Sequence, residues 1–207
     1  AQIKGQIEHF VSKNALDIDG VGNKLVDQLV ESMLVKTVDD LFKLTSDDLL
    51  PLERMAEKSA INIIVSIENS KQTSFSRFLY ALGIRNVGEH LSKVLEKHFE
   101  GDFPRFMLTT KTELESVFEV GEIVADEIIR FWSDASNVEA VRTCFDLGVI
   151  IEPLKLKSSE QLLHGKTFVF TGSLRIFNRK EAQNIVESLG GKSGSSVSKK
   201  TDFVVAG

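Results

Sequence analysis

The apolar positions of the chain recur at helical spacing in four similar stretches. In each stretch a short apolar segment precedes a tight turn, and a helix with apolar residues at i, i+3 and i+4 follows, which is typical of one buried helix face. In the clearest example the turn lies between Ile18 and Leu25. The apolar turn residues, 34, 32 and 33 residues apart, are Val21, Met55, Val87 and Val120. This near-constant spacing predicts an internal repeat of four helix–turn–helix units.

The turn of the first unit has a composition suited to an anion. Gly20 and Gly22 allow backbone angles that residues with a Cβ avoid, and they let the N–H groups at a helix start approach a phosphate closely. The equivalent pairs in the later units are Arg54 and Ala56, Asn86 and Gly88, and Glu119 and Gly121. Because Arg and Glu adopt left-handed backbone angles less readily than Gly or Asn, we expect units one and three to keep this geometry best.

Basic or titratable side chains stand two residues beyond the second small position in units one to three. They are Lys24, Lys58 and His90, and a cation there can reinforce phosphate binding by the amides. Unit four has Ile123 at this point, so we expect that unit to be mainly structural. The predicted contacts to a nucleic-acid backbone are Gly20, Val21, Gly22, Asn23, Lys24, Arg54, Ala56, Lys58, Arg85, Asn86, Gly88 and His90.

The pattern changes after Glu152. A strand is predicted over Lys166–Thr171, followed by a helix over Arg179–Leu189 and by short strands near Lys192 and over Phe203–Ala206. The helix should face inward with Ala182, Ile185, Val186 and Leu189, and the strands have the continuous apolar character of strands buried on both faces. We therefore predict a mainly α protein: a bundle of four tandem units over residues 1–152, a linker over 153–164, and the first half of an α/β domain over 165–207.

Composition places the chain in an ordinary globular class. Of the 207 residues, 42% are hydrophobic and 27% charged, as is usual for folded proteins. No apolar run approaches the roughly 18 residues that span a bilayer, and no signal peptide is recognisable. The single cysteine, Cys144, excludes an intrachain disulfide and a Cys-rich zinc cluster, and the four histidines are scattered. We expect a reducing, intracellular setting and no metal site in this chain.

Charge is distributed unevenly along the chain. Residues 1–154 hold 16 Lys and Arg against 26 Asp and Glu, whereas residues 155–207 hold 9 against 4. An acidic first part opposes a general attraction to nucleic acid. Binding by the repeated units must therefore depend on cations placed locally at the turns.

The repeated turns resemble helix-hairpin-helix motifs, and Gly165–Leu174 resembles the start of a BRCT domain. Four such motifs followed by such a segment are similar to the C-terminal region of bacterial NAD-dependent DNA ligases. Phe75–Arg85 and Ser196–Asp202 are similar to segments of that family, the second within its BRCT domain. The resemblance covers the whole chain.

The resemblance implies a parent enzyme that seals nicks in DNA replication and repair, in the bacterial cytoplasm at the nucleoid. Such enzymes form a lysine–AMP adduct from NAD, and the family implies Mg and Zn as well. The nucleophile lies in a Lys-x-Asp-Gly motif, which this sequence lacks. We therefore expect no catalytic residue, no bound cofactor and no activity in this fragment alone. Its expected role is sequence-independent binding of nicked duplex DNA beside the remaining ligase domains, with no membrane partner.

Two other readings of the sequence stay open. The helical repeats and the BRCT-like part could form a protein-docking module. Alternatively, tandem helix-hairpin-helix motifs also occur at the DNA-binding end of nucleases and branch-processing proteins.

Overall fold

The computed structural model describes residues 2–154, 163, 165–172, 179–198 and 201–206. The chain forms two compact parts, Ala1–Leu154, called the helical region here, and Lys155–Gly207, called the sheet region, and each is described by itself. The predicted linker at 153–164 falls largely on residues 155–162 and 164, which lie outside the described residues. The same holds for parts of the two BRCT-like stretches, namely Ser173, Leu174, Lys199 and Lys200.

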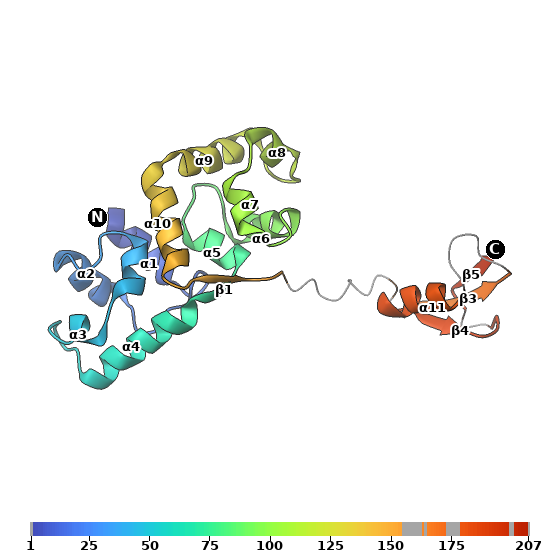
Figure 1. The fold of residues 1–207 in the computed structure, drawn as a ribbon, viewed down its shortest axis with the longest axis horizontal. Coiled ribbons are helices and arrows are strands. Elements are labelled where there is room, and N and C mark those ends of the chain that lie inside the picture. Colours follow the sequence, from blue (N-terminus) through green and yellow to red (C-terminus); the bar gives the residue numbers. More distant parts are fainter. Residues whose placement is uncertain (1, 155–162, 164, 173–178, 199–200, 207) are drawn as a thin grey trace. The chain divides into compact units, whose positions relative to one another are not determined.

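The helical region consists mainly of helices, as predicted (Figure 1). Its helical elements, including one 3-10 helix, are α1 (Gln2–Val11), α2 (Asn23–Glu31), η1 (Val38–Lys43), α3 (Ser46–Leu49), α4 (Glu57–Ser70), α5 (Phe75–Ala81), α6 (Glu89–His98), α7 (Phe103–Met107), α8 (Lys111–Ser116), α9 (Glu122–Ser133) and α10 (Ala135–Asp146). The four predicted units correspond to the helix pairs α1–α2, α3–α4, α5–α6 and α8–α9. The tandem helix-hairpin-helix architecture is therefore confirmed.

The apolar helix faces meet in one core that runs through the helical region. Leu29 of α2, Ile67 of α4, Leu95 of α6 and Ile128 of α9 are each at most 1% exposed, as their spacing predicted. Five phenylalanines lie fully buried in the second half of the helical region, and their rings contact one another at 5.0–5.7 Å between centroids. They are Phe75, Phe78, Phe99, Phe103 and Phe106. Such edge-to-face and tilted ring contacts add to the area that the side chains bury.

A short parallel ribbon contains the last strand of the helical region. Strand β1 (Gln72–Ser74) pairs with β2 (Ile150–Glu152), and Ile150 N–H donates to the carbonyl of Lys71 at 2.8 Å. Helix α10 leads into β2 and packs against η1 and α9 (Figure 1). The pattern of apolar positions did not predict this ribbon, because three-residue strands are too short to show an alternation.

The sheet region is a small parallel sheet with one helix among the described residues. Strand β3 (Thr167–Thr171) lies between β4 (Lys192–Gly194) and β5 (Phe203–Ala206), and α11 (Arg179–Ser188) connects β3 to β4 (Figure 1). This order is the predicted β-α-β-β start of an α/β domain. Its core consists of Phe170, Ala182 and Val186, with Leu163, Phe168 and Val205 packed against it.

Two burial predictions for the sheet region are wrong. Ile185 was expected to face inward, but it is 41% exposed. Strand β5 was expected to be buried on both faces, but Phe203 and Val204 are 49% and 51% exposed. Among the described residues of the sheet region α11 is the one helix, so a single helix is available to cover the sheet. Continuous apolar character thus overstates the burial of these strands.

Candidate nucleic-acid interface

The four repeated turns share one backbone conformation. The first small position is left-handed in every unit, with φ of 87° at Gly20, 60° at Arg54, 62° at Asn86 and 69° at Glu119. In units two to four the next residue donates its N–H to the carbonyl three residues earlier, at 3.0–3.2 Å. The expectation that units two and four lose the turn geometry is therefore wrong. Packing of the flanking helices holds Arg54 and Glu119 in angles that their side chains disfavour on their own.

The second small position is the N-cap of the following helix. Gly22, Ala56, Gly88 and Gly121 all have extended angles, with φ between −97° and −85° and ψ between 154° and 179°. Any residue adopts such angles, so no glycine is required there for conformation. A Cβ added at the three glycines would meet nothing within 4 Å. Ala56 consequently fits unit two without disturbing the turn.

The helices that follow these turns begin differently from their neighbours. In α3, α5, α7, α8 and α10 a Ser, Thr or Asp side chain accepts a hydrogen bond from an N–H group of the first turn. In α2, α4, α6 and α9 the N-cap residue makes no such bond. A helix start has four N–H groups without intrahelical partners, and these carry partial positive charge. The repeated turns therefore present free donors in a geometry that binds anions.

The predicted cations occupy equivalent places at these helix starts. Lys24, Lys58 and His90 are each the second residue of a helix, and all three are exposed. Among the described residues, Lys24 and Lys58 take part in no ion pair, and neither do Arg54 and Arg85 of the turns themselves. By contrast, Lys4, Lys43, Lys71 and Lys111 are all paired with carboxylates. The cations at the first three turns thus include charges that the chain itself does not neutralise.

The first helical residue separates unit one from the others. Asn23 begins α2, whereas Glu57, Glu89 and Glu122 begin α4, α6 and α9. A carboxylate at a helix start stabilises the helix, but it opposes the approach of a phosphate. Unit one, with Lys24 and no acid in its first helical turn, has the most favourable charge for an anion.

The first two turns are fastened to each other's helices. A Cβ on Gly20 would lie 2.9 Å from Cγ1 of Ile63 in α4, and the N–H of Asp19 donates to the hydroxyl of Ser66 at 2.7 Å. In return, the N–H of Glu53 in turn two donates to Oε1 of Gln28 in α2 at 2.7 Å. Between the turns lies a groove of about 460 Å³ whose lining includes Lys24 and Arg54. Sequence spacing alone did not indicate the Gln28 contact.

The last two turns are also in contact, but through a side chain of the predicted site. Nε2 of His90 lies 2.5 Å from Oε2 of Glu119. His90 is therefore engaged by the fourth turn, unlike Lys24 and Lys58. In the same turn Ile123 is 71% exposed and Phe118 is 82% exposed. Ile123 therefore lies outside the core, although unit four was expected to be mainly structural.

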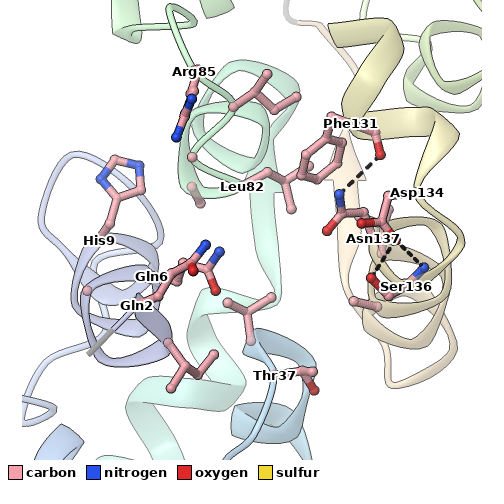
Figure 2. A pocket seen from close by; sticks show the side chains of 18 of the residues that line it. Gln2, Gln6, His9, Thr37, Leu82, Arg85, Phe131, Asp134, Ser136 and Asn137 are labelled. Carbon is pink, nitrogen blue, oxygen red and sulfur yellow. Dashed lines mark hydrogen bonds between the residues drawn. The ribbon is translucent and has the colours of Figure 1, made fainter. Parts of the chain in front are cut away.

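A larger cleft of about 770 Å³ lies among α1, the third turn and the start of α10. Figure 2 shows Arg85 and His9 on one side and Phe131, Asp134, Ser136 and Asn137 on the other. Nε2 of His9 is hydrogen-bonded to the carbonyl of Tyr80 at 2.7 Å, and the Asn137 amide donates to the carbonyl of Phe131 at 3.1 Å. Ser136 donates to the carboxylate of Asp134. The polar side chains of His9, Asp134, Ser136 and Asn137 are thus hydrogen-bonded within the protein, and we assign the cleft no chemistry.

Comparison with known families agrees with this architecture. Residues 12–69 match the family described as "SAM-like Helix-hairpin-helix tandem", and residues 77–141 match "Helix-hairpin-helix motif". Residues 158–207 match "BRCA1 C Terminus (BRCT) domain". The class is thus a tandem helix-hairpin-helix protein with a BRCT segment.

Whole-chain similarity narrows this class. The chain is 46% identical over its full length to a protein of Syntrophus aciditrophicus named "DNA ligase", of which it covers 30%. Proteins of the same name from Geobacter metallireducens and Bacillus pumilus are 47% and 42% identical to it, with 31% and 32% of their lengths covered. The chain therefore matches the C-terminal region of DNA ligases, and the predicted resemblance is confirmed at that level. It spans about a third of the length of these relatives.

In the part of the chain that the structure describes, no helix has the length and apolar character needed to cross a bilayer.

Proposed function

We propose that residues 1–154 bind duplex DNA without sequence preference and hold it for nick sealing by an NAD-dependent DNA ligase. One observation carries the proposal: four helices with uncapped starts follow four turns of one backbone conformation. Main-chain N–H groups and lysines at phosphates carry no sequence information. An enzyme that closes nicks wherever they occur requires such indifference.

The residues have distinct roles on this proposal. The N–H groups that follow Gly22, Ala56 and Gly88 bind phosphate oxygens, and Lys24 and Lys58 neutralise the phosphate charge. Arg54 and Arg85 lie in the turns beside these helix starts and add positive charge. Asn23 leaves the first helical residue of unit one uncharged, and Asn86 leaves the left-handed position of unit three uncharged. Val21 is 6% exposed and fixes the first turn to the core. The unpaired state of Lys24 and Lys58 explains how an acidic unit can attract a polyanion.

Catalysis belongs to other parts of the parent protein on this proposal. The sequence has no Lys-x-Asp-Gly motif, so the chain contributes no adenylated lysine. We assign NAD, Mg and Zn to regions of the parent outside these 207 residues. The parent would act in DNA replication and repair, in the cytoplasm at the nucleoid.

Binding is tested by fluorescence anisotropy with the whole 207-residue chain. Labelled duplexes of two unrelated sequences, each intact and nicked, are titrated at several salt concentrations. Equal affinity for the two sequences is expected, with log K falling linearly with log salt because bound counterions are released. Binding that shows no salt dependence would overturn the proposal.

The catalytic assignment is tested separately. Incubation of the chain with NAD and Mg, followed by mass spectrometry, should give the unmodified mass. A mass increase that corresponds to AMP would contradict the assignment of adenylation to other regions of the parent.

A further inference from the structure

The fourth turn carries two large apolar side chains on its surface. Phe118, directly before the left-handed residue, is 82% exposed, and Ile123, the second residue of α9, is 71% exposed. The equivalent residues of the other units are all polar: Asp19, Glu53 and Arg85 at the first place, and Lys24, Lys58 and His90 at the second. Single exposed apolar residues are common on protein surfaces. Two of them at both ends of one repeated turn, where three sister turns are polar, form a distinct surface.

The acids of the same turn are engaged by other side chains. Glu119 accepts a hydrogen bond from His90 at 2.5 Å. Glu122 lies 3.4 Å from the ammonium of Lys111, which also contacts Asp126 at 2.6 Å. The negative charges that would repel a polyanion are therefore partly neutralised within the unit.

The backbone of the fourth turn has the same form as that of the turns proposed to bind DNA. Glu119 is left-handed with φ of 69°, and Gly121 caps α9 at φ −86° and ψ 170° without a side-chain bond. The His90 contact joins the third turn to the fourth, so any surface formed by turn three continues directly into turn four.

From these observations we infer that the fourth turn binds DNA by apolar contact, with Phe118 and Ile123 packed against sugar and base faces. This inference rests on the proposed function. Minor-groove proteins frequently insert apolar side chains, Phe and Ile among them, between the base steps of a duplex, where these side chains contact the partly unstacked bases. Such contact releases no counterions and discriminates little between sequences. The four units then divide the work: turns one to three hold phosphates, and turn four contacts the interior of the groove.

The test uses Phe118→Ser, Ile123→Ser and the double variant in the whole chain. The double variant should bind duplex DNA about tenfold more weakly at every salt concentration, because the apolar area that Phe118 and Ile123 would bury on DNA is lost. The slope of log K against log salt should stay that of the unchanged protein, because no phosphate contact is lost. Phe118→Leu, which keeps an apolar side chain, should retain most of the affinity.

Met33→Ser is the matched control, because Met33 is 65% exposed and follows the far end of α2 from the first turn. It should bind DNA as the unchanged protein does. Both exposed positions should tolerate serine, which thermal unfolding checks; if the double variant melts early, the comparison of Phe118→Ser with Phe118→Leu decides.

Two outcomes would overturn the inference while leaving the proposed function intact. The first is salt-dependent binding of equal strength by the double variant and the unchanged protein, which would reserve Phe118 and Ile123 for a protein partner or a second copy of the chain. The second is a weakened variant with a smaller salt slope, which would mean that phosphate contacts were lost. If the unchanged protein itself shows no salt-dependent binding, the proposed function fails, and the inference fails with it.

Discussion

His90 and Glu119 join two successive helix-hairpin-helix units, with Nε2 of one 2.5 Å from Oε2 of the other. His90 is the second residue of α6, and Glu119 is the left-handed residue of the fourth turn. Each of the two side chains reduces what the other would contribute to the proposed DNA surface. The third turn has the left-handed geometry of the first, but the side chain of His90 is held by Glu119 of the fourth turn.

Glu119→Gln should strengthen DNA binding. The substitution removes one negative charge from the proposed interface and weakens the hold on His90, and an exposed charge contact of this kind corresponds to an affinity gain of about two- to fivefold. Anisotropy titration at fixed salt measures the gain. Glu139→Gln removes an equal charge from an exposed site on α10, outside the four repeated turns, and should have a smaller effect. Equal gains from both variants would show that only net charge matters.

Lys24→Glu and Lys58→Glu should weaken binding to all duplex sequences alike. Each lysine is proposed to neutralise a phosphate, so each loss should reduce the salt slope by about 1. Lys97→Glu makes the same charge change at the opposite end of α6 from the third turn and should leave the slope nearly unchanged. Wild-type slopes in the Lys24 and Lys58 variants would refute the choice of these residues.

Gly20→Ala and Gly22→Ala should differ although the two glycines are two residues apart. Gly20 has φ of 87°, and an added Cβ would lie 2.9 Å from Cγ1 of Ile63, so the variant should lose about 1–3 kcal/mol of unfolding free energy. Gly22 has extended angles and open space around it, so its variant should be as stable as the unchanged protein. Urea unfolding of both variants provides the comparison. Equal losses would contradict the separate roles of the two positions.

Asp48 should contribute to stability in a pH-dependent way. Hydrogen bonds from the hydroxyl and the N–H of Thr45, at 2.7 and 2.8 Å, lower the pKa of the Asp48 carboxyl. Because the folded value is the lower one, the stabilisation is fully present above the unfolded pKa of about 3.9 and is lost as pH falls below it. Asp48→Asn should lower the unfolding free energy at pH 7 by about 1 kcal/mol and flatten its fall in acid.

Asp47→Asn is the control for that measurement, because Asp47 lies in the same helical turn and caps nothing in the described region. Unfolding curves from pH 7 to pH 3 compare the two variants. An acid profile for Asp48→Asn that parallels the unchanged protein would contradict the capping role.

Cys144 should resist alkylation until the protein unfolds. Burial raises the pKa of its thiol to about 12, and the side chain is fully buried. At pH 8 the native thiol is thus protonated and inaccessible, whereas the unfolded thiol regains a pKa of about 8.5. Iodoacetamide labelling followed by mass spectrometry should be slow in buffer and fast in urea. Rapid labelling of the native protein would show that α10 opens readily.

The sequence predicts helix existence and helix faces well because burial imposes a 3.6-residue period. Leu29 and Leu95 are examples, each identified by spacing and each fully buried. Backbone angles at the turns were predicted less well. Residue preferences pointed away from a left-handed Arg54 and Glu119, but the surrounding helices impose that conformation on both. Tertiary packing decided the geometry, and intrinsic preference did not.

Some features of the candidate interface leave no mark in the pattern of apolar positions. Phe118 looks like core in a stretch with apolar neighbours, and only the fold places it on the surface. The absence of capping side chains at the repeated turns could have been noticed, since Gly or Ala stands at each N-cap while Thr45, Ser74 and Thr110 precede other helices. The contact of Gln28 with Glu53 joins residues 25 positions apart, beyond the range of local rules.

The ribbon of β1 and β2 has a consequence for how the protein folds. Gln72 pairs with Ile150, 78 residues later, so the chain must close a long loop before this contact can form, and distant pairings of this kind slow folding. During synthesis the first two helix-hairpin-helix units leave the ribosome well before their strand partner exists. A product that ended before residue 150 would expose the backbone groups of β1, an open strand edge that other molecules could pair with.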